Sequence, residues 1–440
     1  MPLVAARIRQ EDREILRLAG PAFLALVAEP LFLLADSAIV GHLGTRQLAG
    51  LGIAGAVLST LISVCIFLAY GTTASVARRI GAGDLRAALT QGLHGIWLAI
   101  VIGVATTALG IPLTPVLVGL FKPGSGVAHE AETYLRIGLV GAVPLLVALA
   151  TTGILRGLQD TRTPLVVAVA GNLANVGLNL WLVYGLDLGI AGSALGTVLA
   201  QSASAAALLV VVVRAARRHE APLRPSLSGI RGAGSAGVPL LLRTLTLRAS
   251  LLVMTYAATA LGPTDLAAMQ VAMTVWTFLA FALDAIAIAA QAITGRHLGA
   301  GDRERTRAIT TRMLRWGVLS GVVTGLALAA AAPWLGGLFT DDAGVRDLLV
   351  PVLLVAAITQ PLAGIVFVLD GVLIGAGDGR YLAWAGLLVL VVFAPAAWLA
   401  VSAGGTLTWL WVAFALAFMG GRGAVLLGRA ATDRWMRLGA

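Results

Sequence analysis

Three polar side chains interrupt an apolar stretch near the start of the chain, between Pro21 and Gly41. They are Glu29, Asp36 and Ser37. An acid inside a membrane helix costs roughly 2.5 kcal/mol or more on insertion scales, and intramembrane acids mark ion pathways by default. Burial disfavours the charged form of a carboxyl group, so a buried acid can take up and release a proton. We therefore predict that Asp36 is the coupling-ion site of a transporter. The alternative is that Asp36 only forms a hydrogen bond to a neighbouring helix.

The composition places this acid in a membrane protein. The chain has 440 residues, of which 59% are hydrophobic and 12% are charged. Apolar runs of about 20 residues recur along it, and each is long enough to span a bilayer. The net charge of +10 indicates arginine-rich cytoplasmic loops, and we expect no nucleic-acid partner. Cys65 is the only cysteine and the histidines are scattered, so we expect no disulfide, metal or cofactor.

We predict an all-α membrane protein of twelve transmembrane helices, in two parallel six-helix repeats around a central cleft. The loops after the even-numbered helices are rich in arginine, so the positive-inside rule places both termini in the cytoplasm. We expect a multi-pass protein of the cell (plasma or inner) membrane. The predicted helices cover residues 14–41, 47–78, 88–112, 128–156, 163–185, 189–214, 233–261, 266–295, 306–331, 344–375, 381–401 and 405–430.

The repeat is visible when the chain is shifted by 218 residues, because Pro21 then falls on Pro239 and residues 81–84 fall on residues 299–302. Such repeats are typical of alternating-access transporters. We predict an N-terminal lobe at 1–213, a cytoplasmic linker at 214–232 and a C-terminal lobe at 233–440. Both copies of the Gly-Ala-Gly-Asp motif follow a membrane helix. We interpret them as tight turns whose aspartates cap the next helix, and not as phosphate loops.

Three motifs in order give the chain a family resemblance: Ala35-Asp36-Ser37 with the following Gly41-His42-Leu43-Gly44, residues 153–162, and residues 189–197. Through them the sequence resembles the multidrug and toxic compound extrusion (MATE) family, within it the branch of DNA-damage-inducible protein F. The resemblance covers essentially all twelve predicted helices. It implies an efflux antiporter that exchanges protons or sodium ions for drugs, often organic cations. It also implies an acid on the first helix that faces a pocket in the N-terminal half.

The residues support such a pocket independently. Asn172, Asn175 and Asn179 share one helix face. At 1.5 Å per residue, Asp36, Asn179 and Thr197 lie roughly 8, 9 and 12 Å below the outer ends of their helices. The resemblance assigns ion coupling to Asp36, Asn175, Asn179 and Thr197. Archaeal members of the family carry a second aspartate where this chain has Asn179, so protons are favoured over sodium. The alternative for the asparagines is interhelical hydrogen bonding.

Prolines on the first helix suggest how it could bend. Pro21 and Pro30 each remove a helix hydrogen bond, and the resemblance links the first of them to bending when the acid is protonated. Pro239 repeats Pro21 in the second half, so we also expect a structural role for it.

The second half has a different polar set, because Met254 stands at the position equivalent to Asp36. Its polar cluster is Arg248, Asp284 and Asp370, and we expect Arg248 to pair with Asp284. This pair either locks the half together or forms a second ion or substrate site. The candidates for a substrate cavity are Asn172, Gln270, Trp276, Gln291 and Gln360, with Trp276 suited to cation–π contact or to core packing.

The predicted function is export of small cationic or amphipathic compounds by a monomer in the lipid bilayer, in exchange for protons or possibly sodium ions. One alternative is a flippase for lipid-linked precursors from the same superfamily. It would need a cationic cavity, for which Arg243 and Arg248 are the few candidates. A membrane transferase or hydrolase would need clustered catalytic groups, and His42, His94, His129, His219 and His297 are dispersed.

Overall fold

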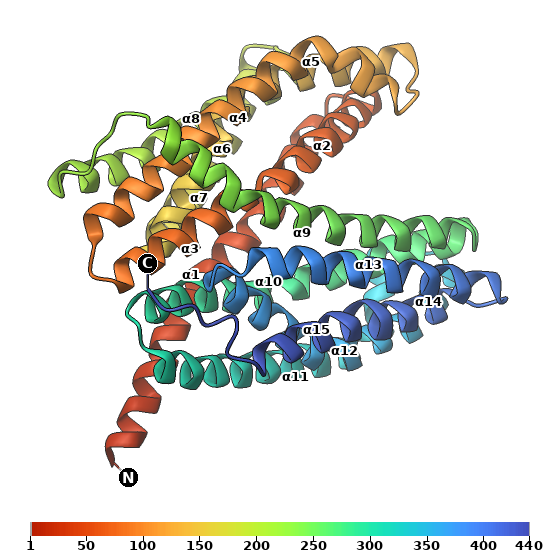
Figure 1. Ribbon diagram of the computed structural model, residues 1–440. Helices are drawn as coiled ribbons and strands as arrows, with labels where there is room; N and C mark the ends of the chain where they lie inside the picture. Colours follow the sequence, from red (N-terminus) through yellow and green to blue (C-terminus); the bar gives the residue numbers. More distant parts are fainter. Residues whose placement is uncertain (1, 440) are drawn as a thin grey trace. The chain divides into compact units, whose positions relative to one another are not determined.

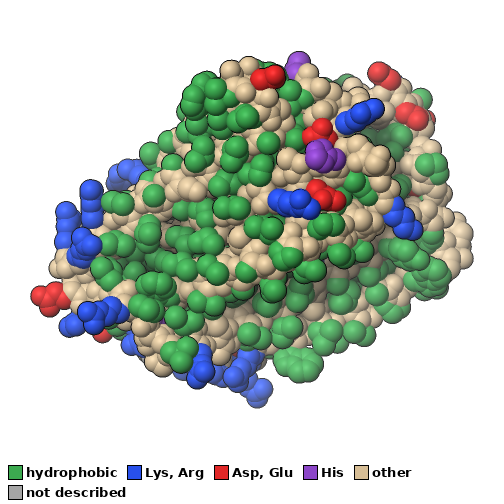
Figure 2. All heavy atoms as spheres, turned by 90° about the horizontal axis from the view of Figure 1, so that it is seen from above, with side chains coloured by type: hydrophobic (Ala, Val, Ile, Leu, Met, Phe, Trp, Pro, Cys, Tyr) green, Lys and Arg blue, Asp and Glu red, His purple; other side chains and the backbone are tan. Residues whose placement is uncertain are grey.

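The computed structural model describes the backbone of residues 2–439 and the side chains of residues 10–439. This part of the chain is helical and contains no strand (Figure 1). Eleven of its helices are long and apolar enough to cross a membrane, or twelve when one bent pair counts as a single span. Hydrophobic side chains cover much of the face in Figure 2, as expected for a surface that contacts lipid. The predicted all-α membrane fold is confirmed.

The helices follow one another with short connections. In chain order they are α1 (Pro2–Gly41), α2 (Thr45–Cys65), α3 (Phe67–Gly81), α4 (Leu85–Gly119), α5 (Ser125–Val140), α6 (Ala142–Gly157), α7 (Arg162–Leu180), the π-helical turn η1 (Trp181–Gly185), α8 (Gly189–Arg218), α9 (Leu227–Thr259), α10 (Pro263–Gly299), α11 (Arg303–Phe339), α12 (Ala343–Gly375), α13 (Gly379–Ser402), α14 (Leu407–Ala413), the π-helical segment η2 (Phe414–Gly420) and α15 (Gly421–Ala430).

Several predicted helices are longer or more divided than expected. The predicted helix at 128–156 consists of α5 and α6, which meet at Gly141 with a bend of 49°. The one at 47–78 consists of α2 and α3, which are separated at Ile66. In contrast, α4 continues through Pro112 and Pro115 to Gly119, beyond the predicted end at 112. Membrane helices tolerate proline because neighbouring helices, Ser or Thr side chains and small local adjustments can satisfy the freed backbone groups.

The two Gly-Ala-Gly-Asp motifs form equivalent turns. Gly83 and Gly301 have φ values of 80° and 75°, which glycine adopts without strain. The Asp84 side chain accepts a hydrogen bond from the Ala87 backbone N–H at 2.8 Å, and Asp302 accepts one from Arg305 at 2.9 Å. Both aspartates therefore cap the helix that follows, and the interpretation as turns and caps is confirmed.

The described chain divides into two compact units. One holds residues 24–238, and the other holds the chain up to Phe23 together with the chain from Pro239 onward. The first helix of each repeat, α1 and α9, therefore has its beginning in one unit and its remainder in the other. Each division falls within two residues of Pro21 or of its repeat, Pro239. The lobes at 1–213 and 233–440 and the linker at 214–232 stay a prediction.

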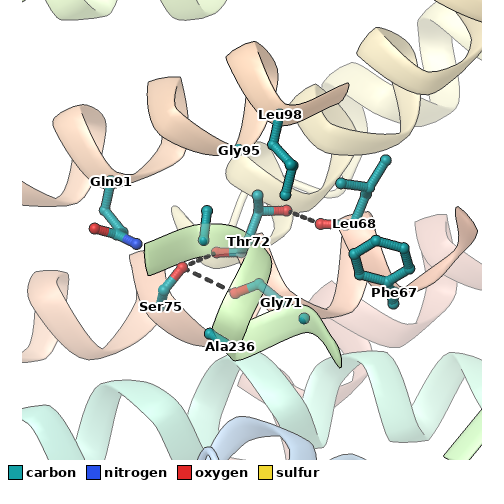
Figure 3. A pocket seen from close by; sticks show the side chains of 11 residues that line it. Phe67, Leu68, Gly71, Thr72, Ser75, Gln91, Gly95, Leu98 and Ala236 are labelled. Carbon is teal, nitrogen blue, oxygen red and sulfur yellow. Dashed lines mark hydrogen bonds between the residues drawn. The ribbon is translucent and has the colours of Figure 1, made fainter. Parts of the chain in front are cut away.

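The beginning of α9 packs on α3 and α4 within the unit of residues 24–238. Figure 3 shows this contact, in which Ala236 of α9 lies beside Gly71 and Ser75 of α3. Phe67 and Thr72 of α3 and Leu98 of α4 line the same small cavity. A side chain at Gly237 would meet the Phe67 ring, so the close approach of α9 requires glycine there. A small cavity of about 40 Å³ remains at the contact. This contact is therefore mainly apolar.

The beginning of α1 is held in its own unit by charged groups. Asp12 accepts hydrogen bonds from Arg312 Nε at 2.7 Å and from Trp316 Nε1 at 2.7 Å, and its second oxygen contacts another Arg312 nitrogen. Glu14 pairs with Arg296 at 2.6 Å. A two-pronged arginine–carboxylate pair is stronger and more directional than a single contact. Through Asp12 and Glu14, these pairs attach the beginning of α1 to α11 and α10.

We expect Asp12→Asn to loosen this attachment, because the substitution removes the charge that Arg312 binds through two nitrogens. The expected local loss is about 1–2 kcal/mol, the usual size for hydrogen bonds to charged groups. Hydrogen exchange of backbone amides in residues 10–23 should become faster, whereas exchange in α12 should not change. Trp316→Phe, which keeps an aromatic ring but removes one donor, should have a smaller effect. Unchanged exchange in Asp12→Asn would contradict this attachment.

Candidate functional site

A cavity of about 610 Å³ lies in the unit of residues 24–238, lined by α1, α2, α5, α6, α7 and α8. This volume is within the range of ligand pockets, roughly 300–1,000 Å³. From α1, the residues that line it are Glu29, Phe32, Leu33, Asp36 and Ser37. Their spacing is that of one helix face. Most of the other lining residues are apolar, so Glu29 and Asp36 place two carboxyl groups in a largely apolar wall.

Asp36 is the centre of a buried hydrogen-bond network in this wall, with 4% of its surface exposed. Its Oδ1 accepts hydrogen bonds from Asn179 of α7 at 2.8 Å and from Ser193 of α8 at 2.7 Å. Its Oδ2 accepts a longer one from the Tyr134 hydroxyl of α5, at 3.3 Å. Donors from three helices therefore hold the carboxylate of a fourth. Because Oδ2 has the weaker contact, it is the oxygen better placed to take a proton.

Asn175 and Thr197 form a second polar contact in the same region. Asn175 Nδ2 donates to Thr197 Oγ1 at 3.0 Å, and both residues line the cavity beside Asp36. The amide oxygens of Asn175 and Asn179 are buried and have no partner among the described residues. The structure thus brings together all four residues predicted for ion coupling. It adds two buried oxygen acceptors near the carboxylate.

Asn172 forms a second contact between α7 and α1, in addition to the one between Asn179 and Asp36. Its Nδ2 donates to the Ala28 carbonyl at 3.2 Å, two turns before Asp36. The helix α1 continues without interruption through both Pro21 and Pro30, and their role in bending stays a prediction. Asn172 also lines the cavity, and its assignment to a substrate cavity stays a prediction.

Two partners of Asp36 were not predicted from the sequence. Ser193 precedes Thr197 by four residues, so it lies on the same face of α8, and this spacing was an available signal. Gly196, next to Thr197, allows the close approach of Asn179, because a side chain there would meet the Asn179 amide. For Tyr134 no such signal exists, since only the packing of α5 brings its hydroxyl to α1.

The other unit has a different polar centre, built on Asp370 of α12. Asp370 accepts a hydrogen bond from Arg243 Nε of α9 at 3.1 Å and one from Arg422 of α15 at 3.1 Å. All three residues are at least nine-tenths buried. Arg422 also lies over the Phe418 ring, 5.6 Å from its centroid. Sequence reasoning placed Asp370 with Arg248 and Asp284 and did not single out Arg422. The pairing of Arg248 with Asp284 stays a prediction.

The remaining substrate-cavity candidates lie in this second unit. Trp276 packs edge-on against Phe414, with ring centroids 5.5 Å apart, and also contacts Phe367. This arrangement favours the core-packing interpretation of Trp276. Gln291 and Gln360 are buried, and Gln270 is exposed. Their assignment to a substrate cavity stays a prediction.

A comparison with family models identifies the chain. The model described as MatE matches residues 21–181 and again residues 239–399. The chain belongs to the MatE family. Both ends of the second match lie 218 residues after those of the first, so the predicted repeat is confirmed. The chain is a multi-pass membrane transporter of this family and not an enzyme. The flippase alternative is not favoured.

Relatives cover most of the chain. It is 30% identical over 404 residues to Protein DETOXIFICATION 44, chloroplastic, of Arabidopsis thaliana, across 89% of this chain and 76% of that protein. It is 27% identical over 377 residues to DNA damage-inducible protein F of Escherichia coli, across 84% and 82%. An outward-facing structure of a multidrug resistance MATE family transporter has the same fold, with a TM-score of 0.87 and 22% identity over 96% of both chains.

We expect Asp370→Asn to destabilise the protein, because it leaves Arg243 and Arg422 buried without a counter-charge. Breaking a buried pair in this way costs roughly 3–5 kcal/mol. The thermal unfolding midpoint in detergent should therefore fall clearly below that of the unmodified protein. Asp347→Asn makes the same chemical change at an exposed position and should leave the midpoint unchanged. Equal midpoints for the two variants would show that Asp370 does not neutralise the arginines.

Proposed function

We propose that this protein exports small cationic or amphipathic compounds across the cell membrane in exchange for protons, with Asp36 as the proton site. The observation that carries the proposal is the position of Asp36. Its carboxyl group is buried, is held by donors from α5, α7 and α8, and lies in the wall of a cavity large enough for a drug-sized molecule. Intramembrane acids in such positions serve ion pathways by default.

The network gives this carboxyl group two defined states. Without a proton, both oxygens accept the hydrogen bonds from Asn179, Ser193 and Tyr134. With a proton on Oδ2, the carboxyl group becomes a donor there, and the Tyr134 hydroxyl can turn and accept, since a phenol does both. Protonation therefore reverses one hydrogen bond between α1 and α5. A reversible change between two helices is a plausible start for a conformational transition.

Alternating access would use these states in sequence. In the outward-facing state Asp36 gains a proton, α1 bends near Pro21 or Pro30, and the compound is displaced outward. In the inward-facing state the proton leaves, and a new compound binds. The arginine-rich loops after even-numbered spans support an orientation with both termini in the cytoplasm. The names of relatives, among them multidrug resistance proteins, support a drug-like substrate.

Sodium is the competing coupling ion, and one observation favours it. Among the described residues the buried amide oxygens of Asn175 and Asn179 have no partner. Asn179 contacts Asp36 and Asn175 lines the same cavity, and hard cations prefer oxygen ligands. However, the site supplies one carboxylate, Asp36, together with neutral donors. A site of low charge with a protonatable oxygen suits a proton better than a metal cation. We therefore assign the coupling to protons.

Transport into proteoliposomes tests this assignment. Under an imposed proton gradient, with sodium absent, the unmodified protein should move a fluorescent organic cation, and Asp36→Asn should reduce transport to the level of empty vesicles. Asn175→Ala should retain partial transport, because it leaves the titratable group in place. Gradient-driven transport that persists in Asp36→Asn would exclude Asp36 as the coupling site. Transport driven by a sodium gradient alone would show that the coupling ion is sodium and not the proton.

We also expect Asn179→Asp to create a sodium response. The new carboxylate would stand where the amide now contacts Asp36 at 2.8 Å, and two carboxylates at this distance are stable only if they share a proton or a cation. Sodium should therefore raise the thermal unfolding midpoint of this variant and leave that of the unmodified protein unchanged. A sodium response of equal size in both proteins would argue that the present site already binds sodium.

A further inference from the structure

Glu29 is the second carboxyl group in the wall of the cavity, and the proton-coupling mechanism does not use it. It lies seven residues before Asp36 and lines the same cavity. Seven residues are almost two helical turns, so both side chains leave α1 on one face, roughly 10 Å apart along its axis. Glu29 and Asp36 are the only charged residues among those described as lining this cavity. Every charged side chain described in this wall is therefore an acid.

The two carboxyl groups differ in how much of them a ligand could reach. Asp36 is 4% exposed, and its oxygens accept three hydrogen bonds from neighbouring helices. A bulky cation could reach it only by displacing these donors, whereas a proton could reach it directly. The Glu29 side chain is exposed, and no side chain in the described part of the chain bonds to it. An unpaired acid on a membrane helix is costly unless it faces a cavity and binds something.

The surface between the two acids is suited to the rest of such a ligand. Phe32 and Leu33 lie between Glu29 and Asp36 on the cavity face of α1. Other parts of the wall are formed by apolar side chains of α2 and α6 such as Leu51, Leu58 and Leu145. A positive group at Glu29 would thus sit beside an apolar and aromatic surface. This combination matches an amphipathic organic cation and is unfavourable for a carboxylate or a phosphate compound.

We propose that Glu29 is the residue that selects the substrate by charge, by pairing with the cationic group of an amphipathic organic cation. This inference rests on the proposed export function and assigns separate roles to the two acids of α1. Asp36 holds the proton and Glu29 holds the cationic group of the substrate. Because the two positions are separate, proton and substrate do not compete for the same oxygen atoms. They influence one another through the charge of Asp36 and through the shared helix α1.

Equilibrium binding to the purified full-length protein in detergent tests this role. Tetraphenylphosphonium and tetraphenylborate are suitable probes, because they have nearly the same size and shape and opposite charge. The unmodified protein should prefer the cation. Glu29→Gln should weaken cation binding roughly tenfold or more, as expected for loss of an ion pair in a partly desolvated cavity, and should leave the weak binding of the anion unchanged. Glu29→Asp keeps the charge and should retain the preference.

A matched control is available in the same unit. Glu132→Gln removes the same charge from a residue that pairs with Arg136 at 2.9 Å and does not line the cavity. It should leave binding of both probes unchanged. The thermal midpoint of Glu29→Gln should not fall, because Glu29 has no partner to lose among the described residues. An unchanged midpoint would show that any loss of binding in Glu29→Gln does not come from a loss of folding.

The outcomes separate this inference from the proposed function. The binding test at one fixed pH imposes no gradient, so it does not require coupled transport. If Glu29→Gln binds the cation as tightly as the unmodified protein, or if the unmodified protein shows no preference for the cation, the role of Glu29 is wrong. Proton-driven transport could still hold in that case. If binding behaves as expected but no gradient drives transport, the export function fails and the cation site remains.

Discussion

The network around Asp36 is the interaction on which the rest of the first unit depends. A buried carboxylate is tolerated only when donors replace the water it has lost. Here those donors come from α5, α7 and α8, so the carboxylate on α1 links three other helices. Apolar packing supports the same arrangement, because Val40, Leu135 and Ala194 belong to one buried cluster that also contains Tyr134. A change in the charge of one group therefore acts on the contacts of four helices.

The two repeats use one scaffold for different chemistry. Under the repeat of 218 residues, Asp36 corresponds to Met254, whereas Arg243 and Asp370 correspond to Ala25 and Thr152. In the first half the acid is held by neutral donors, which leaves it able to change its charge. In the second half Asp370 is paired with two arginines, Arg243 and Arg422, of opposite charge. The first arrangement agrees with the proposed role of Asp36 in proton exchange, and the second is an ion-paired cluster that links α9, α12 and α15.

Much of this site could be predicted from local spacing, and the rest depended on tertiary packing. The face of Asn172, Asn175 and Asn179 follows from helical periodicity, and all three contact other helices in the structure. Tyr134 could not be predicted, because α5 and α6 bend apart at Gly141 and no local pattern indicates which helix α5 approaches. The cluster predicted around Asp370 lacked one of its members for a similar reason. Its second arginine, Arg422, belongs to a helix 52 residues later in the chain.

The path of α1 connects the site to the other half of the protein. This helix is continuous from Pro2 to Gly41, yet its first turns belong to one unit and the turns that carry Glu29 and Asp36 belong to the other. Asp12 and Glu14 attach its beginning to α11 and α10. A helix transmits displacement along its axis because its backbone hydrogen bonds resist stretching. Under the proposed mechanism, a change of contacts at Asp36 would be absorbed either by bending of α1 or by movement of the anchored end. Pro21 lies just before the point of division, where a missing backbone hydrogen bond makes bending least costly.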